Sequence, residues 1–179
     1  NAHMGKNIGP EACAASACTV EIDVLGEPIG KQDQYAAAYG GLNSIRFRGD
    51  GTVHVNPIIL DREKRRALDE HLIMFYTGIT RSASAILSEQ KKNTETEGDK
   101  FASLQRMKQM AVELEKDLSA GHIDAVGESM HTGWLEKKKL AAKISNPQID
   151  EWYEKGMAAG ASGGKLLGAG GGGFLMFYC

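Results

Sequence analysis

The stretch that decides the fold is Gly163-Gly-Lys-Leu-Leu-Gly168-Ala-Gly-Gly-Gly-Gly173, which runs directly into Phe174-Leu-Met-Phe-Tyr-Cys179. The first part holds seven glycines in eleven residues, which is more than a plain connection needs. Because glycine tolerates positive φ, such a run of backbone N–H groups can curve round an anion. The second part predicts a buried strand. We therefore expect a ligand-binding loop ahead of a strand, with a tight connection packed against another backbone as the alternative.

Two well-known phosphate-binding loops are excluded, one by the order of the surrounding elements and the other by the residues of the loop itself. Gly168, Gly170 and Gly173 have the spacing of a dinucleotide-binding fingerprint, which requires a strand before the glycines and a helix after them. Here the pattern predicts a helix before the glycines and a strand after them. The Walker pattern fails as well, because Leu166 follows Lys165 where serine or threonine is required.

A lone acid marks a second segment, Gly26-Glu-Pro-Ile-Gly-Lys-Gln-Asp33-Gln-Tyr35. Asp33 follows a turn broken by glycine and proline, and a run of small residues comes after it. Phosphoryl transfer needs such an acid near a loop that can wrap phosphate, because it depends on positioning, charge stabilisation and a base for the nucleophile. Taken alone, Asp33 is better interpreted as the cap of a helical turn over residues 34–39.

Two basic segments could also either bind an anion or have a purely structural role. At Thr80-Arg81-Ser82 a predicted helix start brings together backbone N–H groups, two hydroxyls and a guanidinium. That combination suits an anionic ligand and a plain helix cap about equally well. Lys137-Lys138-Lys139 are interpreted as the solvated face of an amphipathic helix rather than as a phosphate patch.

The spacing of apolar residues along the chain predicts an α+β protein. A helix over residues 11–25 is expected to bury Ala14, Cys18 and Ile22, which recur every four residues. Residues 93–99 are polar and acidic and predict a mobile loop. In the helix after it, we expect one buried stripe that begins at Phe101. The other expected elements are a hairpin over 42–48 and 52–57, a buried strand over 72–77, a helix over 82–90, two helices over 101–118 and 123–144, and a helix that begins at Pro147.

The composition is that of an ordinary globular protein, with 42% apolar and 25% charged residues. A net charge of −2 argues against a nucleic-acid or anionic-membrane surface, and no apolar run approaches the length of a membrane helix. Three cysteines form no even framework, which predicts a reducing, cytoplasmic compartment and buried structural thiols at Cys13 and Cys18. The histidines show no metal-ligand spacing, so no metal site is predicted within this sequence.

Taken together, three segments resemble the GHMP kinase superfamily, and most closely its sugar kinases. They are Gly26-Glu-Pro-Ile-Gly-Lys-Gln-Asp-Gln-Tyr-Ala-Ala-Ala-Tyr-Gly-Gly41, Phe75-Tyr-Thr-Gly-Ile-Thr-Arg-Ser82 and Gly163-Gly-Lys-Leu-Leu-Gly-Ala-Gly-Gly-Gly-Gly-Phe174. The resemblance implies a two-lobed α+β fold with an active site between the lobes. Residues 1–69 would be the remainder of the N-terminal lobe, and residues 70–179 would form a ferredoxin-like C-terminal lobe.

The resemblance also implies an activity, namely transfer of phosphate from ATP to the anomeric hydroxyl of a heptose 7-phosphate or a related sugar. The partners would then be ATP and a small sugar phosphate, with no nucleic acid and no membrane. Two alternatives stay open. The acceptor could be fucose, galactose or a mevalonate-like alcohol, or the chain could be a non-catalytic binding or assembly module derived from such a kinase.

Roles for individual residues follow from the resemblance. Asp33, helped by Lys31, matches the acid that deprotonates or orients the sugar hydroxyl, and Gln32 and Arg81 would contact the substrate. The glycine loop would lie close to the phosphates of ATP through Gly168, Ala169, Gly170, Gly171 and Gly172.

The family's main phosphate loop, Pro-x-x-x-Gly-Leu-Gly-Ser-Ser, does not occur in this sequence. We therefore expect a piece of a longer kinase, with the main ligands of ATP and Mg²⁺ in an N-terminal part. Asn1-Ala-His-Met4 could be a cloning remnant or the tail of a helix. The sequence does not predict the oligomeric state.

Overall fold

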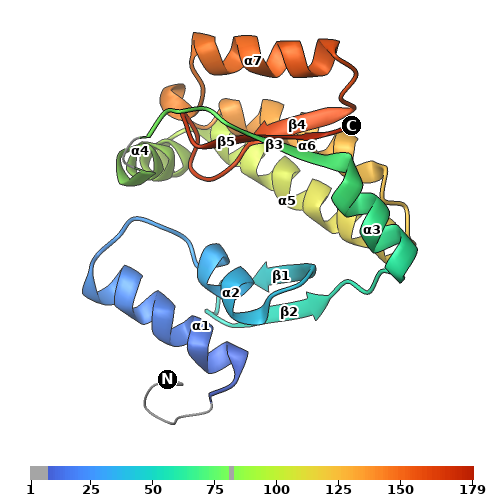
Figure 1. Cartoon of the computed structure of the whole chain (residues 1–179). Helices are drawn as coiled ribbons and strands as arrows, with labels where there is room; N and C mark the ends of the chain where they lie inside the picture. The colour runs from blue at the N-terminus through green and yellow to red at the C-terminus, as the bar shows by residue number, and fades with distance from the viewer. Residues whose placement is uncertain (1–7, 81–82) are drawn as a thin grey trace. The chain divides into compact units, whose positions relative to one another are not determined.

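The computed structural model describes residues 8–80 and 83–179, and they form helices and two small antiparallel sheets (Figure 1). The predicted α+β class is therefore confirmed. The chain divides into two compact units, of which the first ends at Ile59 and the second runs from Leu60 to Cys179. Residues 60–69, which the resemblance assigns to the first part, group with the second unit.

In the first unit, a helix and a hairpin form where the sequence predicts them. Helix α1 (Pro10–Cys18) starts with proline at its first position, where the missing N–H costs nothing. It continues as a π-helix, η2 (Thr19–Val24). The remaining elements are helix α2 (Gln32–Tyr39) and strands β1 (Asn43–Phe47) and β2 (Val53–Pro57), which pair antiparallel.

The first unit has a small core of its own, formed by α1, α2 and the hairpin. Ala14, Cys18 and Tyr35 are buried, and Ile22 packs against them, as the spacing of four residues predicts. Cys13, however, is exposed, so its prediction as a buried thiol is wrong. Cys13 and Cys18 lie five residues apart in the helical segment, so they face different sides and only one can reach the core.

The second unit contains a three-stranded antiparallel sheet in the order β3-β5-β4. Figure 1 shows α7 along one side of this sheet, and α6 runs beside β4. The core between them centres on Trp134, Ile149 and Leu166, none of which is more than 1% exposed. The elements are α3 (Arg62–His71), β3 (Leu72–Tyr76), α4 (Ala83–Thr96), α5 (Gly98–Ser119), α6 (Ala125–Lys138), the 3-10 helix η3 (Ala142–Ile144), α7 (Pro147–Ala158), β4 (Gly163–Leu166) and β5 (Phe174–Tyr178).

The strand β4 was not expected, because the sequence predicts a helix directly before the glycine loop. Its first residue is a glycine for a packing reason. A Cβ atom on Gly163 would lie 1.7 Å from the carbonyl oxygen of Gly127 in α6, so only glycine lets this helix lie against the strand. The exclusion of a dinucleotide-binding fingerprint still holds, because a strand, β5, follows the loop.

Three further predictions for the second unit are wrong in part. Strand β3 forms as expected, but it is an edge strand, and Ile73 and Phe75 are 43% and 57% exposed rather than buried. The loop expected over 93–99 is helical except at Glu97, since α4 runs to Thr96 and α5 begins at Gly98, and the Asn93 amide ties this end of α4 to the Leu140 carbonyl at 3.0 Å. In α5, Phe101 is 52% exposed and does not join the buried stripe.

Candidate functional site

The glycine loop is a hairpin loop, residues 167–173, that joins β4 to β5 and is anchored at several points. The Leu167 amide donates to the Phe174 carbonyl at 2.8 Å, which closes the hairpin. The Gly173 amide donates to the Ile79 carbonyl at 3.0 Å, and the Thr77 amide and hydroxyl both donate to the Gly173 carbonyl at 2.9 Å. The loop is thereby tied to the segment that follows β3.

A second set of contacts holds the tip of the loop against η3. The Gly171 amide donates to the Ile144 carbonyl at 2.5 Å. Gly170 has a φ of +108°, and a Cβ atom there would lie 2.8 Å from the Cα of Ile144. The backbone thus approaches η3 so closely, and in such a conformation, that a side chain is excluded. The tip is fixed by packing rather than left free.

Four amides of this anchored loop remain open. Within residues 8–80 and 83–179, the backbone N–H groups of Gly168, Ala169, Gly170 and Gly172 have no hydrogen-bond acceptor. Donors held in place and left unsatisfied are what an anion-binding loop requires, because no reorganisation is needed when the anion arrives. This arrangement suits the phosphates of a nucleotide.

A lysine from α6 reaches the same loop. The Nζ of Lys137 donates to the Gly168 carbonyl, so the interpretation of all three lysines as a solvated face is wrong for this one. Lys138 pairs with Asp150 at 3.1 Å, and Lys139 pairs with Glu136 at 2.7 Å. Sequence reasoning missed Lys137 because the contact joins residues 31 positions apart and leaves no local pattern.

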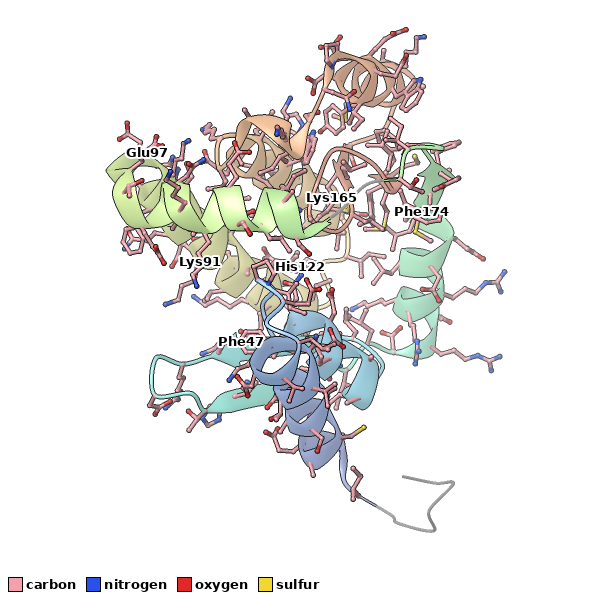
Figure 2. The ribbon with its side chains drawn as sticks, turned by 90° about the vertical axis from the view of Figure 1, so that its left-hand side faces the viewer. Phe47, Lys91, Glu97, His122, Lys165 and Phe174 are labelled. Atoms are coloured by element: carbon pink, nitrogen blue, oxygen red, sulfur yellow. The ribbon has the colours of Figure 1, made fainter. Side chains whose placement is uncertain are left out.

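Another lysine lies on the strand that leads into the loop. Lys165, labelled in Figure 2, belongs to β4 and stands opposite Met176 of β5. It is half-buried, and this burial lowers the pKa of its ammonium group. In the described residues it makes no ion pair.

The Asp33 segment begins α2 in the first unit. Lys31 is the N-cap residue and Asp33 lies in the first turn, where its negative charge interacts favourably with the helix dipole. The cap makes no side-chain hydrogen bond, so the interpretation of Asp33 as a helix cap is wrong. Lys31, Gln32 and Asp33 are all exposed, which leaves them accessible to a ligand.

The structure separates Lys31 from Asp33 although only one residue lies between them. Lys31 and Gln32 line a groove of about 470 Å³, whereas Asp33 lines a second groove of about 370 Å³. Ile29 contributes to both grooves, so they adjoin. No ion pair joins Lys31 to Asp33 among the residues that the structure describes.

Partly buried hydrogen bonds hold α2 in position against α1 and η2. The Tyr35 hydroxyl donates to Glu11 at 2.7 Å, and Gln34 donates to Glu21 at 2.7 Å. The hydrogen bond to Glu11, together with burial, raises the pKa of Tyr35 to about 12. Because these neighbours fix the first turn of α2, the backbone that carries Asp33 is held firmly.

Several site predictions find no test in the structure. Arg81 lies outside the described residues. Asp33 belongs to the first unit and the glycine loop to the second, and each is described within its own unit. The described part of the chain contains no cluster of three or more His, Cys, Asp or Glu side chains placed to hold a metal ion. None of its helices combines the length and apolarity needed to cross a bilayer.

Comparison with known proteins shows what this chain is similar to. Residues 110–179 match the family model "GHMP kinases C terminal". The chain is 30% identical over 171 residues to a D-glycero-alpha-D-manno-heptose 7-phosphate kinase of Campylobacter jejuni, covering 96% of this chain and 50% of that protein. It is 27% identical to a galactokinase of Pyrococcus furiosus, covering 93% of this chain and 53% of that protein.

A solved structure shows the same likeness. The crystal structure of a D-glycero-D-manno-heptose 1-phosphate kinase from Bacteroides thetaiotaomicron matches with a TM-score of 0.68 and 26% identity, over 98% of this chain and 46% of that one. The chain spans about half the length of the curated relatives it matches. Residues 110–179 thus match the C-terminal family of GHMP kinases, and most of the chain is similar to about half of each of these sugar kinases.

Proposed function

We propose that this chain is part of an ATP-dependent sugar kinase that phosphorylates the anomeric hydroxyl of a heptose 7-phosphate or a related sugar. The observation that carries the proposal is the anchored glycine loop with its four open amides. The substrate class is supported by the relatives, since the Campylobacter jejuni protein is named as a kinase of heptose 7-phosphate. A galactokinase among the relatives keeps galactose as an alternative acceptor.

On the nucleotide side, the chain contributes donors rather than a reacting group. ATP supplies the phosphoryl group when it is bound. The amides of Gly168, Ala169, Gly170 and Gly172 donate hydrogen bonds to phosphate oxygens, and Gly171 keeps the loop in shape through its own bond to Ile144. Fixed donors of this kind stabilise the charge that develops during transfer.

On the acceptor side, Asp33 takes the proton of the anomeric hydroxyl. The sugar oxygen then forms its bond to the γ-phosphorus, the bond between that phosphorus and the bridging oxygen of ADP breaks, and the proton on Asp33 passes to solvent. Gln32 and Lys31 bind the sugar from the neighbouring groove. Arg81 is a proposed donor to the same substrate.

We expect the chain alone to be inactive, because the main ligands of ATP are expected in an N-terminal part of a longer protein. The test is therefore a coupled assay of ADP release by that longer protein, with ATP and a panel of sugars and sugar phosphates. Asp33→Asn should lower turnover by at least about 10²-fold, because the amide cannot accept the proton. Nucleotide affinity, measured by calorimetry, should not change. Asp23→Asn is the matched control, since Asp23 is an exposed carboxylate of the same unit that lines neither groove.

Turnover of Asp33→Asn close to that of the unchanged protein would remove Asp33 from its role. Binding of a nucleotide or sugar without ADP release from any acceptor in the panel would instead favour a non-catalytic binding module. A preference for galactose or fucose over the heptose phosphate would keep the kinase and change its substrate. Each outcome therefore points to one of the stated functions.

A further inference from the structure

The groove that contains Lys31 carries positive charge, although it adjoins the groove that contains Asp33. Its lining includes two cations, Lys31 and Arg48, and no carboxylate. Both side chains are exposed, so neither cation is neutralised by burial. Within the described part of the chain, neither forms a salt bridge with an acidic side chain. Two accessible positive charges facing one hollow favour an anionic ligand.

The walls of the same groove are apolar, and they come from three parts of the first unit. The apolar lining residues are Ile22 of η2, Ile29, and Phe47 and Val53 of the hairpin. The volume of about 470 Å³ falls within the range of roughly 300–1,000 Å³ that small-molecule sites have. The groove therefore fits a small organic molecule that carries an anion, rather than a bare ion.

One aromatic ring is held in place to cover such a molecule. Phe47, labelled in Figure 2, is 45% exposed. Its ring forms a T-shaped pair with the ring of the buried Tyr35, and the two ring centroids are 5.7 Å apart. A ring that is fixed on one side and open on the other offers a flat surface to the C–H face of a sugar. The hydroxyl of Thr52 and the amide of Gln32 add hydrogen-bonding groups to the lining.

Asp50 is the carboxylate that could oppose an anion here, since it lies close in sequence to Thr52. It is not part of the lining. Its side chain accepts hydrogen bonds from the Thr52 amide at 2.9 Å and the Thr52 hydroxyl at 2.6 Å. These bonds hold the Asp50 carboxylate in the turn of the hairpin, so its charge is already engaged with local donors.

We infer that Lys31 and Arg48 bind the phosphate of a phosphorylated sugar, while the hydroxyl to be phosphorylated lies at Asp33. The inference rests on the proposed function and adds a subsite to it. It follows from the two adjoining grooves, because a sugar that passes Ile29 would place one end at Asp33 and the other between the two cations. An acceptor with its hydroxyl and its phosphate at opposite ends of the carbon chain matches this layout. Arg48 thereby becomes a specificity-determining residue.

The experiment measures binding of three probes to the chain by calorimetry: a heptose 7-phosphate, the same heptose without phosphate, and inorganic phosphate. The unchanged protein should bind the sugar phosphate at least about tenfold more tightly than the free sugar, since a charge-assisted contact contributes on that scale. Arg48→Gln should remove most of this difference and leave the affinity for the free sugar as it was. Arg48→Lys should retain part of it.

Arg46→Gln is the matched control. It removes one positive charge two residues away, within β1, at a position that does not line the groove. Equal affinity of the unchanged protein for sugar and sugar phosphate would overturn the inference, as would equal losses in Arg46→Gln and Arg48→Gln. Absence of measurable binding of the sugar phosphate would overturn it too.

Failure of the inference can be told apart from failure of the proposed function. If ADP release from ATP depends on the heptose 7-phosphate but Arg48→Gln leaves its KM unchanged, the kinase stands and the subsite is wrong. If the sugar phosphate binds in an Arg48-dependent way without any ADP release, the subsite stands and the kinase proposal fails. Binding and turnover thus report on separate statements.

Discussion

A single methyl group placed between α6 and β4 should reveal how tightly the second unit is packed around its glycines. In Gly163→Ala, the added Cβ would meet the Gly127 carbonyl oxygen at 1.7 Å and its carbonyl carbon at 2.5 Å. Both are backbone atoms of a helix, so neither can rotate away as a side chain could. The helix and the strand must separate, although the strand is hydrogen-bonded to β5 and the helix packs on the core.

The magnitude can be worked out from that distance. Real Cβ atoms keep at least 3.0 Å from such neighbours, so the backbones must part by more than an ångström. Overpacking of a core costs about 1–3 kcal/mol when side chains can adjust, and backbone atoms adjust less, which places this change near the upper end. Alanine restricts the unfolded chain and returns roughly 0.4–1 kcal/mol. We expect a net loss of about 2–3 kcal/mol in the free energy of unfolding.

The assay is urea unfolding of the chain followed by tryptophan fluorescence. Both tryptophans, Trp134 and Trp152, belong to the second unit, so the signal reports this unit alone. Gly98→Ala is the matched control, because a Cβ atom there meets nothing within 4 Å and the residue lies in the first turn of α5. That variant should keep or slightly raise stability. Equal unfolding curves for Gly163→Ala and the unchanged protein would refute the close approach of α6 to β4.

Two further predictions concern the polar contacts of the second unit. The pKa of Glu136 is lowered to about 2 by hydrogen bonds from Arg106, Lys139 and Ser103, so its contribution to stability is complete above about pH 5 and is lost as the pH falls towards 2. Glu136→Gln should therefore lose about 1–3 kcal/mol at pH 7 and converge on the unchanged protein in acid, and a constant difference across the pH range would contradict this. Asn146→Ala removes the side chain that accepts from the Gln148 and Ile149 amides, so unfolding monitored at Trp152 should lose about 1 kcal/mol, while Gln148→Ala should lose less.

The elements that the sequence predicts correctly are those whose signal is local. Helix α7 begins where Asn146-Pro147 predicts it, because the capping side chain and the proline are neighbours in the sequence and both act on the first turn of the helix. The hairpin of β1 and β2 follows from alternating residues around a glycine turn. In α1 and η2, the spacing of Ala14, Cys18 and Ile22 is enough to identify the buried face.

The features that the sequence did not predict have a different origin, since each depends in part on a contact between residues that are distant in the sequence. Strand β4 has no strand-forming pattern, and it exists because it pairs with β5 and Gly127 approaches it. The helix over 93–96 is supported by Asn93, whose amide donates to the Leu140 carbonyl at 3.0 Å. Lys137 reaches the glycine loop from another helix. The contacts with Gly127, Leu140 and Gly168 each join residues more than 30 positions apart, so no short window of sequence contains both partners.

The candidate site shows the same limit at the scale of a few residues. The segment that carries Lys31 and Asp33 is identified from its sequence, but the two side chains line different grooves. A helix turns by about 100° per residue, so side chains two positions apart diverge widely once α2 begins. Proximity along the chain suggested a shared catalytic task, whereas the geometry supports two separate tasks on one substrate.

The glycine-rich stretch, which the sequence presents as one motif, divides into two parts with different physical roles. Gly163 and Gly164 lie in a strand, and a Cβ on either would collide with α6 or with Phe177 of β5, so these glycines serve packing. A Cβ at Gly168 meets nothing, and its amide remains open, so this glycine is available to a ligand. The tight connection therefore occupies the first part of this segment, and the proposed anion-binding loop occupies the second. Because the packed part fixes where the open part begins, a substitution at Gly163 should weaken phosphate binding through a large loss of stability. Gly168 has a φ of +73°, so a substitution there should cost only the strain of that backbone conformation and should weaken phosphate binding mainly at the loop itself.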